Sequence, residues 1–366
     1  MKLPAPSIGR PSPNVVRPKS FGHQVVVVDG QPGCGKTLFT SLISSLDRVE
    51  IMNYSTEVES ICQMHAFDKI TDDAAKLMIQ MKLDEMIYET MMSRRINFRY
   101  SDLSSVFRHP SPFKYFKRAF QKGDELIPDR IKKERPILNL TTHNLLMDSK
   151  PLFDAYQDQI TFIEIIRHPL YMLKQQALNM KRLYNVNMPR AFTPYYQYQN
   201  VYVPFFVYGY EKEFLQGNEF DRAVYSMLSV YQRTELFKKK LAGHLKARLI
   251  TIPFECFVLN PDVYLKQIYQ HLGTHESTAT KKIMKKNKVP RTKLADGIDL
   301  PIYRRCGWQP SESDNEFEEL QLRRQYAIDQ GVSNEALDVL DQLSQSYEKQ
   351  YLFNHNWIWK EVEKVS

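Results

Sequence analysis

The sequence contains few cysteines, and they are widely spaced. Cys34, Cys62, Cys256 and Cys306 form none of the close pairs that zinc sites and disulfide frameworks use. We therefore expect neither a structural metal site nor a disulfide scaffold. This spacing favours a reducing, cytoplasmic-type compartment.

Long hydrophobic runs are also missing. No uncharged apolar stretch approaches the roughly 20 residues that a membrane-spanning helix needs, so we expect no membrane span. The first twenty residues hold five prolines and no apolar core. That composition excludes a signal peptide or membrane anchor there and predicts a flexible, proline-rich tail over residues 1–20.

The remaining composition is that of an ordinary globular protein. The 366 residues are 43% hydrophobic and 25% charged, which is enough to bury a sizeable core. The formal net charge of +8 is spread over the whole length. An even distribution of this kind favours an anionic small ligand over a nucleic-acid surface, so no nucleic-acid partner is expected.

Five short apolar runs alternate with helical patterns. They are Gln24 to Asp29, Arg48 to Asn53, Pro136 to Leu140, Ile160 to Ile166 and Arg248 to Ile252. The first is almost pure valine, as expected of a central parallel strand covered on both faces. The alternation predicts an α/β fold, namely a P-loop-type three-layer sandwich with a central parallel sheet of about five strands and helices on both faces.

Two further segments depart from this alternation. A dense aromatic run at about 190–215 predicts an insertion over the site, with rings that suit an acceptor pocket or the core of a lid. Helical patterns around Leu322 to Tyr326 and Ala336 to Tyr351 predict a C-terminal helical cap. We therefore expect a tail at 1–20, one P-loop domain at 21–310, and a helical extension at 311–366 packed on that domain.

Gly30 to Thr37 is the most informative motif. The eight residues GQPGCGKT fit G-x-x-x-x-G-K-[ST] in full, follow the first strand and open a helix. Glycines let backbone amides converge on phosphate oxygens, the helix N-terminus adds positive potential, and Lys36 adds a full charge. The motif predicts a phosphorylated nucleotide, with Thr37 as a Mg²⁺ ligand if a triphosphate binds. The alternative is a tight glycine turn with a solvated lysine.

The acidic residue that a P-loop phosphotransferase uses to hold its metal is not evident. The third run ends in Thr141, the fourth ends in Arg167, and the fifth reaches Glu255 only after Pro253. Arg167 instead places a fork of donors at the sheet edge that carries the phosphate loop, which suits a second phosphate group. The alternative is an arginine that caps a helix or pairs with a nearby carboxylate.

The order of these segments resembles the sulfotransferase family over most of the chain. The matching segments are VVVVDGQPGCGKTLF, LTTHNLL, FIEIIRHPLYMLKQQ, IPFECFVLNPDVYLKQIYQHLG and PIYRRCGW. The resemblance implies that residues 21–310 form a sulfotransferase-like domain. It also implies a donor, 3′-phosphoadenosine 5′-phosphosulfate (PAPS), whose 5′-phosphosulfate lies on the loop and whose 3′-phosphate lies at Arg167.

The same resemblance implies roles for individual residues. His143, in LTTHNLL, matches the segment where many cytosolic sulfotransferases place a catalytic histidine, which suits removal of an acceptor proton. The alternative is a hydrogen-bonded, helix-capping histidine. The implied catalytic residues are Lys36 and His143, and the implied cofactor-binding residues are Gly33, Cys34, Gly35, Lys36, Thr37, Arg167, Gln175, Arg304 and Arg305.

The sequence departs from the family pattern in four segments. Gly33 stands where the family has a basic residue, and the charge has moved to Lys36. Gln175 replaces a serine, although its amide can still donate to a phosphate. Thr141 replaces a lysine, and Arg304 with Arg305 matches the family's C-terminal Arg-Lys-Gly loop only loosely.

The resemblance implies the first of three possible functions, and the motifs leave the other two open. The first is transfer of a sulfuryl group from PAPS to a hydroxyl or amine of a small-molecule or glycan acceptor, with no metal. The second is an ATP- and Mg²⁺-dependent small-molecule kinase, for which Lys36 and Thr37 argue. The third is nucleotide binding without catalysis. None of the motifs identifies the acceptor.

Overall fold

The computed structural model describes residues 13–184, 192–297, 304 and 310–352. Five parallel strands form its central sheet, in the order β2-β3-β1-β4-β7. They are β1 (Gln24–Gly30), β2 (Val49–Tyr54), β3 (Ile137–Thr141), β4 (Ile160–Ile166) and β7 (Leu249–Pro253). The predicted α/β fold with a five-stranded parallel sheet is therefore confirmed, and three of the five strands begin one residue later than predicted.

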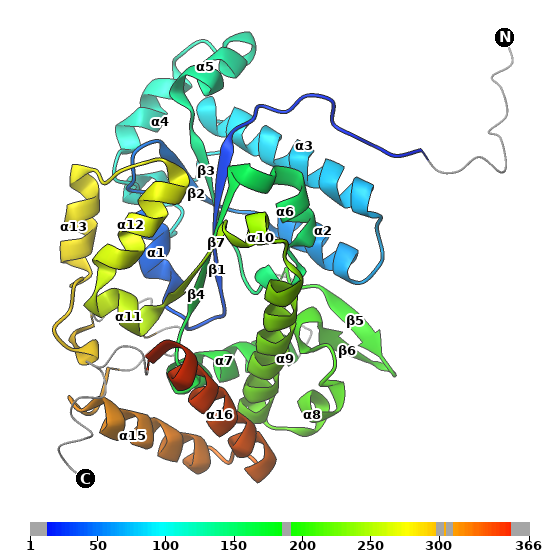
Figure 1. Ribbon diagram of the computed structural model, residues 1–366, viewed down its shortest axis with the longest axis vertical. Coiled ribbons are helices and arrows are strands. Elements are labelled where there is room, and N and C mark those ends of the chain that lie inside the picture. Colours follow the sequence, from blue (N-terminus) through cyan, green and yellow to red (C-terminus); the bar gives the residue numbers. More distant parts are fainter. Residues whose placement is uncertain (1–12, 185–191, 298–303, 305–309, 353–366) are drawn as a thin grey trace, which may run out of the picture.

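Helices cover both faces of the sheet, and Figure 1 shows α2, α3 and α6 on one side with α1, α11 and α12 on the other. The first half of the chain contains α1 (Lys36–Ile43), α2 (Thr56–Ala66), α3 (Asp72–Met91), α4 (Pro112–Ala119), α5 (Ile127–Glu134), α6 (Lys150–Tyr156) and α7 (Pro169–Tyr184). The second half contains α8 (Glu211–Gln216), α9 (Glu219–Lys240), α10 (Gly243–Lys246), α11 (Phe254–Leu259), α12 (Pro261–Leu272), α13 (Thr278–Lys286), α15 (Glu316–Asp329) and α16 (Asn334–Tyr347).

The valines of β1 explain the three-layer arrangement. All four are fully buried, and successive side chains of a strand point to opposite faces of the sheet. Val26 and Val28 belong to the core that contains α1, α7, α9, α12 and α16, whereas Val25 and Val27 belong to the core beneath α2, α3 and α6. Each face of β1 therefore anchors its own helical layer.

The C-terminal helices pack on the first of these cores. α15 contacts α7, and α16 contacts both α7 and α9 (Figure 1). Ala336 and Leu340 of α16 are fully buried there. The predicted aromatic insertion contains an antiparallel hairpin, β5 (Tyr195–Tyr198) and β6 (Val201–Pro204), followed by buried Phe205 and Phe206.

The strand order sets the position of the site. The connection after β1 runs to β2 on one side of the sheet, and the connection after β4 runs to β7 on the other. Adjacent parallel strands whose connections diverge leave a crevice at their carboxyl ends, which is where ligands bind in open α/β sheets. The phosphate loop and Arg167 are the segments that leave these two strands.

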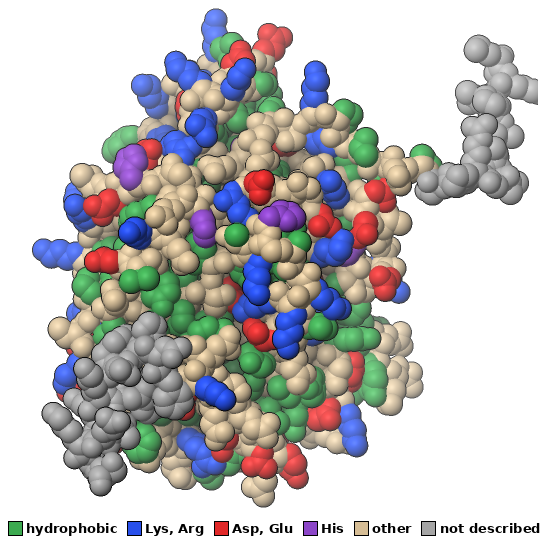
Figure 2. All heavy atoms as spheres, in the orientation of Figure 1, with side chains coloured by type: hydrophobic (Ala, Val, Ile, Leu, Met, Phe, Trp, Pro, Cys, Tyr) green, Lys and Arg blue, Asp and Glu red, His purple; other side chains and the backbone are tan. Residues whose placement is uncertain are grey.

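The surface carries charges of both signs. Figure 2 shows acidic and basic side chains scattered over one face, with Lys and Arg gathered at its upper end over α4 and α5. None of the helices within the described residues is both long and apolar enough to cross a bilayer. Cys34, Cys62 and Cys256 are free and buried, and Cys306 lies outside the described residues.

Candidate functional site

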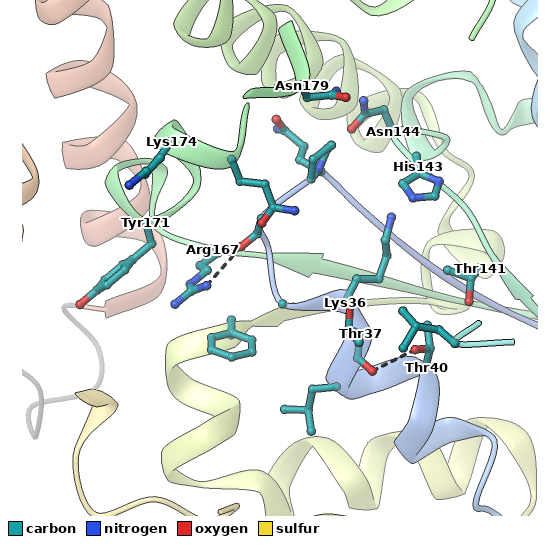
Figure 3. Close-up of a pocket in the computed structure, with 18 of the residues that line it drawn as sticks. Lys36, Thr37, Thr40, Thr141, His143, Asn144, Arg167, Tyr171, Lys174 and Asn179 are labelled. Atoms are coloured by element: carbon teal, nitrogen blue, oxygen red, sulfur yellow. Dashed lines mark hydrogen bonds between the residues drawn. The ribbon is translucent and has the colours of Figure 1, made fainter. Parts of the chain in front are cut away.

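A cavity of about 780 Å³ lies at the carboxyl edge of the sheet. Its walls come from the loops after β1, β3 and β4, from α7, and from the aromatic insertion (Figure 3). Its volume falls within the range of small-molecule and cofactor sites. The predicted residues Gly33, Gly35, Lys36, Thr37, His143, Arg167 and Gln175 all line it.

The phosphate loop requires glycine at Gly33 and Gly35. Their φ angles are 95° and 93°, a region that other residues rarely adopt. A Cβ on Gly35 would also lie 2.3 Å from the Phe254 ring, so α11 packs directly against the loop. Gly35 caps α1 without a side-chain hydrogen bond, which leaves the start of the helix open to an anion.

Lys36 crosses the loop from the first turn of α1. Its Nζ donates to the carbonyl oxygen of Gly30 at 2.9 Å, and it makes a short contact with the carbonyl oxygen of Thr142. The ammonium group is thereby fixed between the ends of β1 and β3. An ammonium has three donors, so one stays available for a ligand in the cavity.

Arg167 lies beside the loop at the end of β4. Its Nη1 donates to the carbonyl oxygen of Gly33 at 3.2 Å, and its guanidinium stands 4.8 Å from the Tyr171 ring centre and 4.6 Å from that of Phe254. Its Nε is 3.8 Å from Glu255 Oε1 and is buried without a hydrogen-bond partner among the described residues. The stacked rings fix the guanidinium while part of its donor capacity is unused.

One face of α7 continues the polar wall. Tyr171, Lys174, Gln175, Asn179 and Arg182 all line the cavity. They recur at three- and four-residue steps, which places them on one side of the helix. Burial, followed by the nearby charge of Arg323, lowers the pKa of Lys174. Lys174 and Arg182 add two positive charges to this wall.

Two more arginines reach this wall from distant parts of the chain. Arg291 lies 5.6 Å from the Phe254 ring centre, and Arg323 of α15 lies 4.3 Å from that of Tyr171. Arg323 also pairs with Glu319 at 2.6 Å. Because both arginines share their rings with Arg167, three guanidinium groups gather around two aromatic side chains.

His143 lies on the opposite side of Lys36 from Arg167 and Lys174 (Figure 3). Its backbone amide donates to Glu59 Oε1 at 2.7 Å, and its Nδ1 is 3.5 Å from the same oxygen. The imidazole stacks on Tyr54, with the ring centres 6.1 Å apart, and is half exposed. Glu59 of α2 therefore orients the histidine.

The carboxylates near the loop already have partners. Asp29, at the end of β1, accepts hydrogen bonds from Thr142 Oγ1 and from the amides of Leu145 and Leu146. Of the two glutamates that line the cavity, Glu59 contacts His143, and Glu255 accepts from Tyr347 and from the amide of His168. Over the described ranges, no group of three or more acidic, histidine or cysteine side chains is arranged to hold a metal ion.

The remaining wall is apolar. Leu103, Leu183, Phe192, Pro194, Phe205 and Phe206 contribute to it. Phe205 and Phe206 stack edge to face, with ring centres 5.3 Å apart. Part of the predicted aromatic insertion thus borders the cavity, and Tyr195 and Tyr196 instead pack on the core.

Two predicted residues, Cys34 and Arg304, do not line the cavity. Cys34 is fully buried, its amide donates to the carbonyl oxygen of Gln31, and burial raises the pKa of its thiol to about 11. It faces the core and is not part of the cavity wall. Arg304 is exposed and outside the wall, and Arg305 lies outside the described residues.

The sequence interpretation missed Glu59, Lys174, Asn179, Arg182 and Arg323. The α7 residues had a detectable signal, because they form a polar stripe at helical spacing beginning just after Arg167. Glu59 and Arg323 had no such signal in the sequence. Each lies on a helix whose distance from the loop is set by tertiary packing alone.

No family model matches the chain, and no curated protein matches it. Among solved structures it is similar to a sulfotransferase domain from the curacin biosynthetic pathway, with 12% identity over 88% of this chain and 97% of that one and a TM-score of 0.40. The sulfotransferase domain of the Synechococcus PCC 7002 olefin synthase also shares 12% identity, over 83% and 94%, with a TM-score of 0.36. A sulfotransferase from Mycobacterium avium gives 12% identity, 85% and 77% coverage, and a TM-score of 0.36. Identities and TM-scores this low support no conclusion about function.

Proposed function

We propose that the chain transfers a sulfuryl group from PAPS to a hydroxyl or amine of an acceptor. The observation that carries this proposal is the surplus of positive charge around one cavity. Lys36, Arg167, Lys174, Arg182, Arg291 and Arg323 line it, against two carboxylates that already have partners. A cavity of this kind suits a ligand with more than one phosphate-like group.

The residues present fit such a donor. The open start of α1 and Lys36 would hold the phosphosulfate end, because backbone amides and an ammonium favour an anion there. Arg167, whose buried Nε makes no hydrogen bond among the described residues, and Gln175 would hold the 3′-phosphate. The rings of Tyr171 and Phe254 hold the Arg167 guanidinium in place, so this side chain loses little conformational freedom when a ligand binds.

The opposite side of Lys36 suits the acceptor. In this reaction the acceptor oxygen or nitrogen bonds to sulfur, the sulfur–oxygen bond to the 5′-phosphate breaks, and the acceptor proton must be removed. His143 would take that proton, and Glu59 would orient the imidazole and stabilise its charged form. Lys36 would neutralise charge on the leaving phosphate. Phe205 and Phe206 would contact an apolar part of the acceptor.

The carboxylates distinguish this proposal from the kinase alternative. A P-loop kinase needs a strand-end carboxylate for Mg²⁺, and Asp29 is the nearest candidate in the sheet. Its two oxygens already accept three hydrogen bonds from Thr142, Leu145 and Leu146. That engagement supports a donor that needs no metal carboxylate.

Replacing His143 by alanine tests the acceptor side. We expect sulfuryl transfer from radiolabelled PAPS, measured over a panel of phenols, amines and sugars, to fall about a hundredfold, because a positioned base contributes at least that much. Glu59 would remain as a weaker base. Binding of adenosine 3′,5′-bisphosphate should be unchanged.

The matched control for this variant is His244→Ala, which removes an exposed histidine of α10 outside the cavity wall. It should transfer like the parent. Full turnover in His143→Ala would show that the histidine does not accept the proton, whatever the donor.

A further inference from the structure

A cluster of exposed aromatic side chains lies far along the chain from the phosphate loop. Phe120 is 91% exposed, Phe113 81%, Tyr100 75%, Phe98 53% and Phe107 47%. Together with half-buried Phe116 we call these residues the aromatic patch. Large apolar side chains rarely gather on a protein surface in this number unless they contact a partner.

Five of the six rings of the patch form one continuous surface, and Phe120 follows at the end of α4. Phe116 lies 5.9 Å from Phe98, 6.1 Å from Phe107 and 6.4 Å from Phe113, measured between ring centres, and Tyr100 lies 6.1 Å from Phe107. Two separate segments therefore contribute to it, the loop after α3 and the helix α4. Leu103, in the same loop, lines the cavity of the candidate site.

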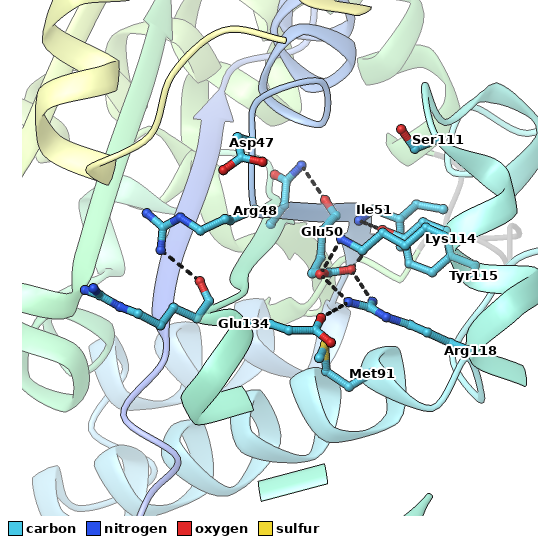
Figure 4. Close-up of polar contacts among 12 residues, drawn as sticks. Asp47, Arg48, Glu50, Ile51, Met91, Ser111, Lys114, Tyr115, Arg118 and Glu134 are labelled. Carbon is cyan, nitrogen blue, oxygen red and sulfur yellow. Dashed lines mark hydrogen bonds and ion pairs between the residues drawn. The ribbon is translucent and has the colours of Figure 1, made fainter. Parts of the chain in front are cut away.

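The opposite face of α4 explains why these rings point outward. Lys114, Tyr115 and Arg118 all contact Glu50 of β2, at 2.7 Å, 2.9 Å and 2.8 Å (Figure 4). Arg118 also donates to Glu134 at 2.9 Å. These polar contacts attach α4 to the edge of the sheet through the face opposite its exposed rings.

The phenylalanines of α4 and its C-cap residue Phe120 have the spacing of one helix face. Phe113, Phe116 and Phe120 stand three and four residues apart, and Lys117 lies between them. α4 is thus amphipathic in an unusual sense, with a charged face toward the protein and an aromatic face toward solvent.

The segment that carries the patch is mostly basic. Residues 94–122 contain eight Lys and Arg and a single acidic residue, Asp102. Ion pairs with carboxylates involve Arg94, Arg95, Arg99, Lys114 and Arg118. Arg108, Lys117 and Lys122 are exposed and have no acidic partner in the part of the chain that the structure describes. An anionic partner would therefore meet three free cations.

We propose that the aromatic patch docks the protein on an anionic lipid bilayer. Aromatic rings favour the interface between headgroups and acyl chains, and Lys and Arg beside them attract acidic headgroups. The three free cations are the feature that selects an anionic bilayer surface over a neutral one. This binding goes beyond the proposed sulfuryl transfer and does not depend on it.

Vesicle sedimentation of the full chain tests the proposal. We expect binding to vesicles of phosphatidylcholine with phosphatidylserine, much weaker binding to phosphatidylcholine alone, and loss of binding at high salt. The triple variant Arg108→Gln, Lys117→Gln, Lys122→Gln should bind the anionic vesicles about a hundredfold more weakly. The pair Phe113→Ser, Phe120→Ser should bind about tenfold more weakly.

Matched controls separate the patch from general surface charge. Lys282, Lys285 and Lys286 are exposed lysines of α13, and changing all three to glutamine should leave binding unchanged. Phe317→Ser removes an exposed ring of α15 and should also leave vesicle binding unchanged. The proposal is overturned if the parent does not bind anionic vesicles, if the patch variants bind as the parent does, or if the α13 variant loses as much binding as the patch variants. Vesicle sedimentation measures binding without turnover. Failure of membrane docking can therefore be told apart from failure of the proposed sulfuryl transfer.

Discussion

Replacing Lys36 by methionine is expected to lower sulfuryl transfer from PAPS about a thousandfold. Methionine keeps most of the aliphatic stem and removes the ammonium that bridges the ends of β1 and β3. A positive charge fixed where negative charge develops in the transition state contributes about two to three orders of magnitude in rate. Because the effect acts mainly on the transition state, the loss should be larger in kcat than in binding.

Two comparisons make this result specific. Lys282→Met removes an exposed lysine of α13 outside the cavity, and it should leave transfer unchanged. Thermal unfolding of Lys36→Met should stay close to that of the parent, which would show that the loop still folds. Undiminished transfer in a folded Lys36→Met protein would contradict the proposed role, and no transfer in the parent with any acceptor would favour nucleotide binding without catalysis.

The second large effect is expected on stability, at Glu50. This carboxylate is buried, and its partners Lys114, Tyr115 and Arg118 attach α4 to β2 (Figure 4). Removing one member of a buried ion cluster leaves the others unpaired in a poorly solvated site. Glu50→Gln should therefore lower the free energy of unfolding at neutral pH by about 3 to 5 kcal/mol.

Glu50 also predicts that the protein loses stability in acid. Burial alone would raise the pKa of Glu50, but the charges of Lys114 and Arg118 and their hydrogen bonds lower it from 4.5 to about 2. A depressed pKa in the folded state means that the stabilisation is complete above about pH 5 and is lost as the pH falls toward 2. Over this pH range the free energy of unfolding loses about 3 kcal/mol through Glu50.

Denaturant unfolding of the parent and of Glu50→Gln from pH 7 to pH 2 checks both statements. The difference in unfolding free energy should shrink as the pH falls, because protonation removes the charge that the variant already lacks. Glu134→Gln is the matched control, since this carboxylate also contacts Arg118 but is half exposed. It should cost less than about 1 kcal/mol. A constant difference across the pH range would show that the charge of Glu50 is not what stabilises the cluster.

Much of the fold could be predicted because its signals are local. The valine run of β1 and the four other apolar runs were sufficient to predict the parallel sheet, and GQPGCGKT was sufficient to predict a strand, a turn and a helix. The strand ends were predicted less well. β3 extends to Thr141, which is buried like the apolar residues before it although its side chain is polar.

The site was predictable only where its residues follow strands. Lys36, His143 and Arg167 lie within a few residues of the ends of β1, β3 and β4, and parallel strands bring their carboxyl ends to one edge. Glu59 and Arg323 reach the same cavity from α2 and α15, whose positions depend on packing between helices. Cys34 is part of the loop motif, but the turn at Gly33 and Gly35 directs its side chain into the core.

Calorimetry with adenosine 3′,5′-bisphosphate and with ATP, each with and without Mg²⁺, tests the central proposal most directly. The cavity combines Lys36 with Arg167. Asp29, the carboxylate at the end of β1, already accepts three hydrogen bonds and is not free to hold a metal ion. We therefore predict that the bisphosphate binds equally well with and without Mg²⁺, and more tightly than ATP. Absence of bisphosphate binding, together with tight binding of ATP only in the presence of Mg²⁺, would contradict the account and favour a kinase.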